Sequence, residues 1–370
     1  MDERSPVDRP KYRLIFEALK ESILSGEYGQ GTRLPSENDL VRRFGVSRMT
    51  IVKAIKELQQ LGLVVRRVGS GTFATSRVDK EGRLFGLLIP ELGQTEIFEP
   101  ICQGMANFPA ASKHSLLWAN SVGEDQPKER VAEELCHQYI AQRVSGVFFS
   151  PVELTPIMDE VNRRIMTAFD RAKIPVVLLD RCFTPYPRRS RYDLVGIDNR
   201  RTGYVATEHL LKAGAKRIAF LGKRFSAGTV DLRIAGYREA LFAHRAAGNK
   251  DMVTHGDPSD EDLIRSVLRT QKPDAFVSAN DHTAATLMQT LLKLNRQIPE
   301  DIRIVGIDDV KYASLLPIPL TTQHQPCLDI GRVAMSTMLG RLESPDLPTR
   351  DILLNTRLVV RKSCGSRTES

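Results

Sequence analysis

The sequence predicts an α/β protein with two parts: a small N-terminal domain of helices and a β-wing, and a larger domain built on parallel sheets. Three observations carry this prediction. Residues 34–75 hold two short helical patterns followed by two short strands, apolar runs alternate with helical segments from residue 84 onwards, and the polar segment 76–83 separates the two patterns. The expected domains are therefore residues 1–75 and 84–365, joined by a linker at 76–83.

Cap residues and apolar spacing define the helices of the first domain. Ser36 has Asp39 three residues later, as in a capping box, and Gly45 suits the left-handed backbone that ends many helices. Ser47 is expected to cap a second helix, whose apolar residues recur at spacings of three and four and so share one face. The other expected elements are a helix at 11–25 and wing strands at 63–67 and 72–74.

This arrangement is a winged helix-turn-helix, and its chemistry fits double-stranded DNA. A major groove admits one α-helix, and the residues at that helix's N-terminal end reach the base edges. Arg48, Thr50 and Lys53 occupy this end of the second helix, and an arginine can bridge two acceptors of guanine. Arg66 and Arg67 on the wing suit phosphates.

The segments RLPSE at 33–37, FGVSRMT at 44–50, GLV at 62–64 and GSGTF at 69–73 resemble the GntR family of winged-helix regulators. The resemblance implies DNA contacts, and Val52 departs from it because many members have arginine there. The expected DNA-binding residues are Arg33, Ser36, Ser47, Arg48, Thr50, Lys53, Arg66, Arg67 and Gly71.

Charge and cysteine content agree with a DNA partner inside a reducing compartment. The chain of 370 residues has a net charge of +8, and residues 1–78 hold 14 Lys and Arg against 9 Asp and Glu. Five scattered cysteines form no disulfide or metal pattern, and neither an apolar signal peptide nor a membrane-spanning run is present in the sequence. We expect a cytoplasmic protein with no cofactor and no metal site.

The second domain is expected to hold two doubly wound lobes, because continuous apolar strands alternating with helices indicate buried parallel sheets. Trp118, the only tryptophan, falls in the second expected strand and is expected in the core. The expected strands are 84–89, 116–119, 146–149, 176–179, 194–197, 218–221, 275–278 and 304–307. The expected helices are 98–112, 128–142, 155–172, 200–213, 232–247, 260–270 and 284–294.

Ligands of open α/β sheets bind beyond the carboxyl ends of the strands. Polar and aromatic side chains follow several expected strands here, and they could hydrogen-bond vicinal hydroxyls or cover an apolar sugar face. They include Phe98, Ser150, Asp180, Arg181, Asn280 and Asp308. Arg233 is expected to open a helix, where a guanidinium opposes the helix dipole and so needs a partner such as a ligand or a carboxylate.

The segments VGIDN at 195–199, GAKRIAFL at 214–221, RIAGY at 233–237, AND at 279–281, GIDD at 306–309 and PLTT at 319–322 resemble the LacI and galactose-repressor family. That family has a periplasmic-binding-protein-like fold, which implies lobe 1 at about 84–195 and 326–342 and lobe 2 at about 196–325 and 343–365. The overall layout resembles the arabinose-repressor group. The implied effector contacts are Ile97, Phe98, Ser150, Asp180, Arg233, Asn280, Asp308 and Gln325, with Ile97 in place of a common second aromatic residue.

The sequence therefore predicts a homodimeric transcriptional repressor that a monosaccharide, such as the pentose arabinose, releases from its operator. The same architecture could respond instead to a nucleobase or a sugar phosphate. A sugar-processing enzyme with an accessory DNA-binding module is disfavoured because no phosphate-binding loop occurs. A sugar-transport protein is disfavoured by the winged helix and by the lack of a signal peptide.

Overall fold

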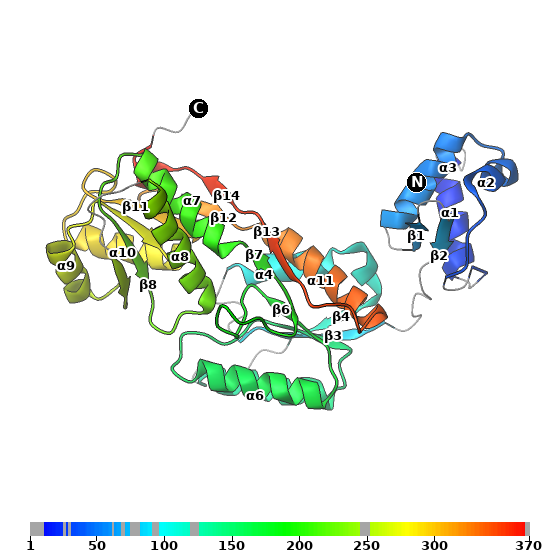
Figure 1. The fold of residues 1–370 in the computed structure, drawn as a ribbon, viewed down its shortest axis with the longest axis horizontal. Coiled ribbons are helices and arrows are strands. Elements are labelled where there is room, and N and C mark those ends of the chain that lie inside the picture. Colours follow the sequence, from blue (N-terminus) through cyan, green and yellow to red (C-terminus); the bar gives the residue numbers. More distant parts are fainter. Residues whose placement is uncertain are drawn as a thin grey trace, which may run out of the picture. The chain divides into compact units, whose positions relative to one another are not determined.

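A computed structural model describes most of the chain and divides it into two compact units (Figure 1). The first unit comprises residues 1–83 and 109–114, and the second comprises residues 84–108 and 115–370. The described residues are 11–24, 27–28, 31–60, 63–67, 71–74, 82–90, 96–118, 126–244 and 252–366.

The first unit is a three-helix domain with a two-stranded wing. Its elements are α1 (Lys11–Leu24), α2 (Glu37–Phe44), α3 (Arg48–Gln60), β1 (Val64–Arg67) and β2 (Gly71–Ala74). Ser36 and Asp39 form the expected capping box, and Gly45 ends α2 at a φ of 62°. One buried side chain from each helix, Leu19, Leu40 and Leu58, meets in a shared core. The predicted winged helix-turn-helix is thus confirmed.

The second unit contains two six-stranded sheets, one for each lobe. The first sheet has the order β13-β7-β6-β5-β3-β4 and is parallel throughout. Its strands are β3 (Leu84–Leu88), β4 (Ser115–Leu117), β5 (Gly146–Phe149), β6 (Val176–Leu179), β7 (Asp193–Ile197) and β13 (Asp351–Leu354). The second sheet has the order β14-β12-β11-β10-β8-β9, in which only the edge pair of β12 and β14 is antiparallel. Its strands are β8 (Ile218–Gly222), β9 (Val253–His255), β10 (Ala275–Ser278), β11 (Arg303–Asp308), β12 (Thr321–His324) and β14 (Arg357–Val359).

Helices cover both sheets, so the doubly wound prediction is confirmed. The first lobe carries α4 (Phe98–Ala106), α5 (Lys128–Ala141), α6 (Met158–Arg171) and α11 (Cys327–Glu343). The 3-10 helix at Pro109–Lys113 lies between α4 and β4 in the sequence but belongs to the first unit. The second lobe carries α7 (Asn199–Lys212), α8 (Gly228–Ala243), α9 (Glu261–Thr270) and α10 (Asp281–Lys293), with 3-10 helices at Lys311–Ser314 and Lys362–Cys364. In Figure 1, α6 and α11 lie on opposite sides of the first sheet.

All eight expected strands are present to within two residues, but β9, β12, β13, β14 and α11 were not expected as elements. The lobe boundary also needs a correction. The sequence placed 343–365 entirely in the second lobe, whereas β13 pairs with β7 in the first sheet. The chain therefore crosses between the sheets three times: after β7, after β12, and between β13 and β14, the last crossing visible in Figure 1.

Trp118 was expected in the core, and this prediction is wrong. Strand β4 ends at Leu117, and the Trp118 side chain is 55% exposed. An apolar residue at the end of a short edge strand need not have a sheet or a helix above it.

No helix among the described residues is long and apolar enough to cross a membrane.

Small residues let the paired helices approach closely in both lobes. A Cβ atom on Gly331 of α11 would overlap the carbonyl oxygen of Ile101 in α4, and one on Gly104 of α4 would overlap that of Leu328. Gly203 and Gly236 have the same role between α7 and α8. The backbones therefore pack against each other without intervening side chains.

We predict that Gly331→Ala lowers the free energy of unfolding by about 1–3 kcal/mol, because the helices must separate to admit the methyl group. Gly340→Ala is a matched control in the same helix, since a Cβ there meets no atom within 4 Å. It should leave stability unchanged or raise it by up to about 1 kcal/mol. Urea titration followed by circular dichroism measures both, and equal stabilities of the two variants would contradict the packing argument.

Candidate functional site

The N-terminal end of α3 is built by a local hydrogen-bond cluster. The Ser47 hydroxyl accepts a hydrogen bond from the backbone N–H of Thr50 (3.3 Å) and lies 2.8 Å from the Thr50 hydroxyl. Arg48 and Met49 follow the cap and are exposed. The cap thus leaves Ser47, Arg48 and Thr50 together at the helix end that the sequence assigned to DNA.

Glu37, which the sequence analysis did not select, holds two of the predicted DNA-binding arginines. Its Oε2 accepts from Arg48 Nε at 3.0 Å, and its Oε1 accepts from Arg66 Nη2 at 2.8 Å. The Glu37 side chain is 15% exposed, whereas that of Arg48 is 69% exposed. One carboxylate therefore fixes a guanidinium from the helix and another from the wing while both remain open to a partner. The signal for Glu37 was its place directly after Ser36.

Arg33 completes this group of basic residues. It forms a β-bridge with Phe73, and its Nε would be 2.7 Å from a Cβ atom on Gly71, whose φ is 113°. Glycine at this position therefore gives Arg33 room to lie over the wing. Arg33, Arg48, Arg66 and Gly71 line one hollow of about 240 Å³.

The other predicted DNA-binding residues either have partners within the first unit or have side chains outside the described residues. Ser36 also lines the hollow, but its hydroxyl donates to Asp39 in the capping box at 2.6 Å. The Lys53 ammonium lies 3.9 Å from the ring centroid of Tyr12 in α1. The Arg67 side chain lies outside the described residues.

We predict that Arg48→Ala weakens binding to an operator selected from random DNA by about 1–3 kcal/mol, with a smaller loss for unrelated DNA. Arg66→Ala should weaken both and flatten the dependence of log K on log salt, as the loss of a phosphate contact does. Arg130→Ala removes an exposed, ion-paired arginine from α5 in the other unit and is the control. Fluorescence anisotropy at fixed salt measures all three, and wild-type operator affinity in Arg48→Ala would remove Arg48 from the site.

The predicted effector residues cluster at the carboxyl ends of strands from both lobes. Ser150 and Asp180 directly follow β5 and β6, and Asn280 and Gln325 lie one or two residues beyond β10 and β12. Asp308 is the last residue of β11. The backbone N–H of Ala227, in the second lobe, donates to Glu153 Oε2, in the first, at 3.0 Å, so the two lobes face each other at this edge.

Arg181 and Glu153 form the centre of the first-lobe side. The sequence named Arg181 only as a strand-end residue and did not select Glu153 at all. Arg181 donates from Nε to Asp180 Oδ2 at 3.0 Å and forms an ion pair with Glu153. Its guanidinium lies 5.8 Å from the ring centroid of Phe98. Burial alone would raise the pKa of Glu153, but the attraction of Arg181, together with the hydrogen bonds from Ala227 N–H and from Arg181, outweighs it and lowers that pKa. The signal for Arg181 was its position next to Asp180.

Ser150 and Ile97, two other predicted effector residues, lie in the first lobe. The Ser150 side chain is buried and lines a small pocket with Phe98, Glu153 and Arg181. Ile97 is half-buried and precedes α4 without capping it.

Arg233 is buried on the second-lobe side but does not open a helix as expected. Helix α8 begins at Gly228, so Arg233 lies in its second turn and the argument from the helix dipole does not apply. Its Nε donates to Asn199 Oδ1 at 2.8 Å and its Nη1 donates to the Ala279 carbonyl at 2.5 Å. Asn280, the next residue, caps α10 by accepting from Thr283 N at 2.8 Å.

Asp308 and Gln325 form a hydrogen-bonded pair at the strand ends of the second lobe. Asp308 has a φ of 131°, and its Oδ1 accepts from Gln325 Nε2 at 2.6 Å. Loss of solvation raises the pKa of Asp308 to about 8, in spite of the opposing effect of Arg233. Gln325 Oε1 is buried and has no hydrogen-bond partner among the described residues. A ligand donor at this position would satisfy it.

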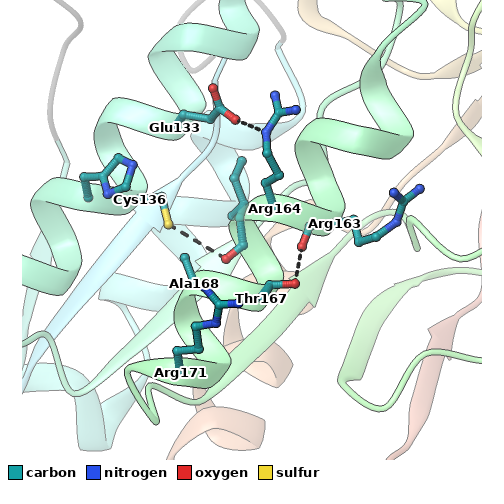
Figure 2. Close-up of a pocket in the computed structure, with 9 residues that line it drawn as sticks. Glu133, Cys136, Arg163, Arg164, Thr167, Ala168 and Arg171 are labelled. Carbon is teal, nitrogen blue, oxygen red and sulfur yellow. Dashed lines mark hydrogen bonds and ion pairs between the residues drawn. The ribbon is translucent and has the colours of Figure 1, made fainter.

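A separate hollow lies between α5 and α6, and none of the predicted effector residues lines it (Figure 2). It measures about 380 Å³, and Arg163, Arg164 and Arg171 line it. Glu133 accepts a hydrogen bond from Arg164 Nε at 2.6 Å. Among the described residues, no group of three His, Cys, Asp or Glu side chains is placed to hold a metal ion.

The raised pKa of Asp308 makes stability depend on pH. The folded chain holds this proton between pH 3.8, the ordinary value for the group, and about pH 8, whereas the unfolded chain releases it. The free energy of unfolding should therefore fall as pH rises through this window. Asp308→Asn should make the fall shallower in urea titrations across the window. An unchanged slope would show that Asp308 ionises normally.

Comparisons with known proteins agree with both units. Residues 11–74 match the family of bacterial regulatory proteins called gntR, and residues 207–364 match a periplasmic binding protein-like domain. The chain is 25% identical over 371 residues to the arabinose metabolism transcriptional repressor of Geobacillus stearothermophilus, covering 96% of this chain and 97% of that protein.

Two solved structures share the fold of the larger unit. A GntR transcription regulator from Chromobacterium violaceum is 26% identical, with a TM-score of 0.59 over 77% of this chain and 100% of that one. A LacI family regulator from Enterococcus faecium with bound ribose is 21% identical, with a TM-score of 0.62 over 76% of this chain and 98% of that one.

The proteins that resemble this chain are regulators of transcription rather than enzymes. The chain is accordingly a transcriptional regulator in which a DNA-binding domain of the gntR family precedes a periplasmic-binding-protein-like domain of the LacI type.

Proposed function

We propose that the chain is a repressor whose winged helix binds an operator and whose two-lobed domain binds a neutral monosaccharide that releases it. The observation that carries this proposal is the polar set around Asp308. A carboxyl group, a buried amide oxygen without a donor and a nearby guanidinium offer acceptors and donors to several hydroxyl groups at once.

The balance of charge favours an uncharged sugar over a sugar phosphate. Arg181 pairs with two carboxylates, Asp180 and Glu153, and Arg233 already donates to the amide oxygen of Asn199 and the carbonyl oxygen of Ala279. Both guanidinium groups are thus already used within the protein, whereas a phosphate binds best where arginine or lysine is free to form a bidentate pair with it. Neutral hydroxyl groups can bind here without adding charge.

The aromatic environment disfavours a nucleobase. Phe98 is buried, and the guanidinium of Arg181 lies over its ring. A base stacked on Phe98 would have to displace Arg181 from two carboxylates, which leaves buried charges without partners.

The named relatives support a pentose as the effector. The Geobacillus protein is a repressor of arabinose metabolism, and the Enterococcus regulator holds ribose. Arabinose remains the favoured candidate for this chain.

Repression by this chain would involve a homodimer acting in the cytoplasm, where the operator lies. One small winged helix buries too little DNA for a specific site, so two copies would read two half-sites. Closing of the lobes around a sugar would change how the two subunits meet and thus the spacing of their recognition helices.

The test is release of a selected operator by L-arabinose, D-ribose and their 5-phosphates, measured by fluorescence anisotropy. We expect a free pentose, and not its phosphate, to release wild-type protein. Asp308→Asn should bind the operator normally but fail to respond to the sugar, whereas Asp329→Asn on the exposed face of α11 should respond normally.

Thermal unfolding gives an independent readout, because ligand at 100 times its Kd stabilises a protein by about 2.7 kcal/mol. Release by the phosphates alone, or full release of Asp308→Asn, would contradict the proposed ligand and its site.

A further inference from the structure

Two hydrogen bonds join the lobes at a place where the chain does not cross between them. The backbone N–H of Leu154, in the loop after β5, donates to the carbonyl oxygen of Phe225 at 2.7 Å. The backbone N–H of Ala227 donates to Glu153 Oε2 at 3.0 Å. The covalent crossings lie elsewhere, after β7, after β12 and between β13 and β14. These two contacts can therefore break without any change in the fold of either lobe.

Glu153 has a second partner, Arg181, within the first lobe. Its Oε1 forms the ion pair with Arg181, whose side chain is only 8% exposed, while the Glu153 side chain is 17% exposed. One carboxylate thus binds the backbone of the second lobe with one oxygen and the central guanidinium of the first-lobe site with the other. Separation of the lobes would remove the first interaction and keep the second.

The position of Ala227 strengthens the contact between the lobes. Ala227 is the N-cap residue of α8, and its own side chain provides no cap. Glu153 accepts from the backbone N–H of this N-cap residue, as the third helical side chain does in a capping box, and a carboxylate near a helix N-terminus interacts favourably with the helix dipole. The attraction of Arg181 keeps this carboxylate ionised, since it lowers the pKa of Glu153.

We propose that Glu153 is an interlobe latch: it stabilises the closed arrangement of the effector domain relative to the open one and connects closure to the effector site through Arg181. Its regulatory meaning rests on the proposed function, because a sugar that binds Arg181 and Asp180 would stabilise the arrangement in which Glu153 also reaches Ala227. Glu153 is a positioning residue in this account and need not touch the sugar.

The direct test measures the distance between the lobes in the full-length chain. Ketone-bearing residues at the exposed positions Arg163 in α6 and Arg269 in α9 accept spin labels without reaction at the native cysteines. Pulsed electron paramagnetic resonance then gives the distance distribution, first without sugar and then with L-arabinose or D-ribose. Circular dichroism melting confirms that each variant is folded.

Without sugar, we expect Glu153→Ala to shift the distribution to longer distances than in the wild type. Glu153→Gln, whose amide oxygen can accept from Ala227 but cannot form the ion pair, should give an intermediate shift. Glu133→Gln is the control, because it also removes a carboxylate that pairs with an arginine of the first lobe, but on the α5–α6 face. Its distribution should equal that of the wild type.

A wild-type distribution in both Glu153 variants, or an equal shift in Glu133→Gln, would overturn the latch. This outcome is distinct from failure of the proposed function, since the comparison without sugar needs no effector. If neither pentose changes the wild-type distribution while Glu153→Ala still opens the lobes, the latch stands and the proposed sugar response fails.

Discussion

Neutralisation of buried charge at the facing edges of two sheets is the constraint on which the effector domain depends. Arg181 and Arg233 are both buried, and a buried cation without partners is strongly destabilising. Arg181 meets this requirement with two carboxylates, and Arg233 with an amide oxygen and a carbonyl oxygen. The strand ends that carry these groups are also unusual, since Asp180 and Asp308 have φ values of 65° and 131°. Such backbone conformations persist only where the surroundings enforce them, and they are frequent at binding sites.

The sequence predicted the strands of this domain because most of them are continuous apolar runs. It did not predict β12, because the residues Thr321–His324 are polar. They are nevertheless mostly buried, since their hydroxyl and amide groups form hydrogen bonds with segments distant in sequence. Strands β13 and β14 were not expected for a different reason: they are edge strands that lack a buried apolar run. Trp118 was misplaced because its apolar character says nothing about what covers the end of an edge strand.

The functional residues likewise divide into those that local sequence patterns predicted and those that depend on contacts between distant segments. The rule for strand ends identified Asp180, Asn280 and Asp308, because the carboxyl ends of parallel strands share one edge. It could not identify Glu153 as the partner of Arg181, nor Glu37 as the partner of Arg48 and Arg66, because partner choice depends on how loops from separate elements meet. In both units, a carboxylate that fixes arginines was the residue that local patterns did not reveal. Arg233 was found by resemblance, while its expected place at the start of a helix was wrong.

The central claim is that a neutral sugar binds at Asp308, and proton linkage tests it most directly. Sugar hydroxyl groups that donate to this carboxyl would favour its charged form and lower its pKa. Isothermal titration of the full-length chain with L-arabinose or D-ribose, near pH 8 in buffers of different ionisation enthalpy, measures the protons exchanged. We predict proton release on binding to the wild type and none on binding to Asp308→Asn. Sugar binding without proton exchange in the wild type, or with equal exchange in Asp308→Asn, would contradict the account.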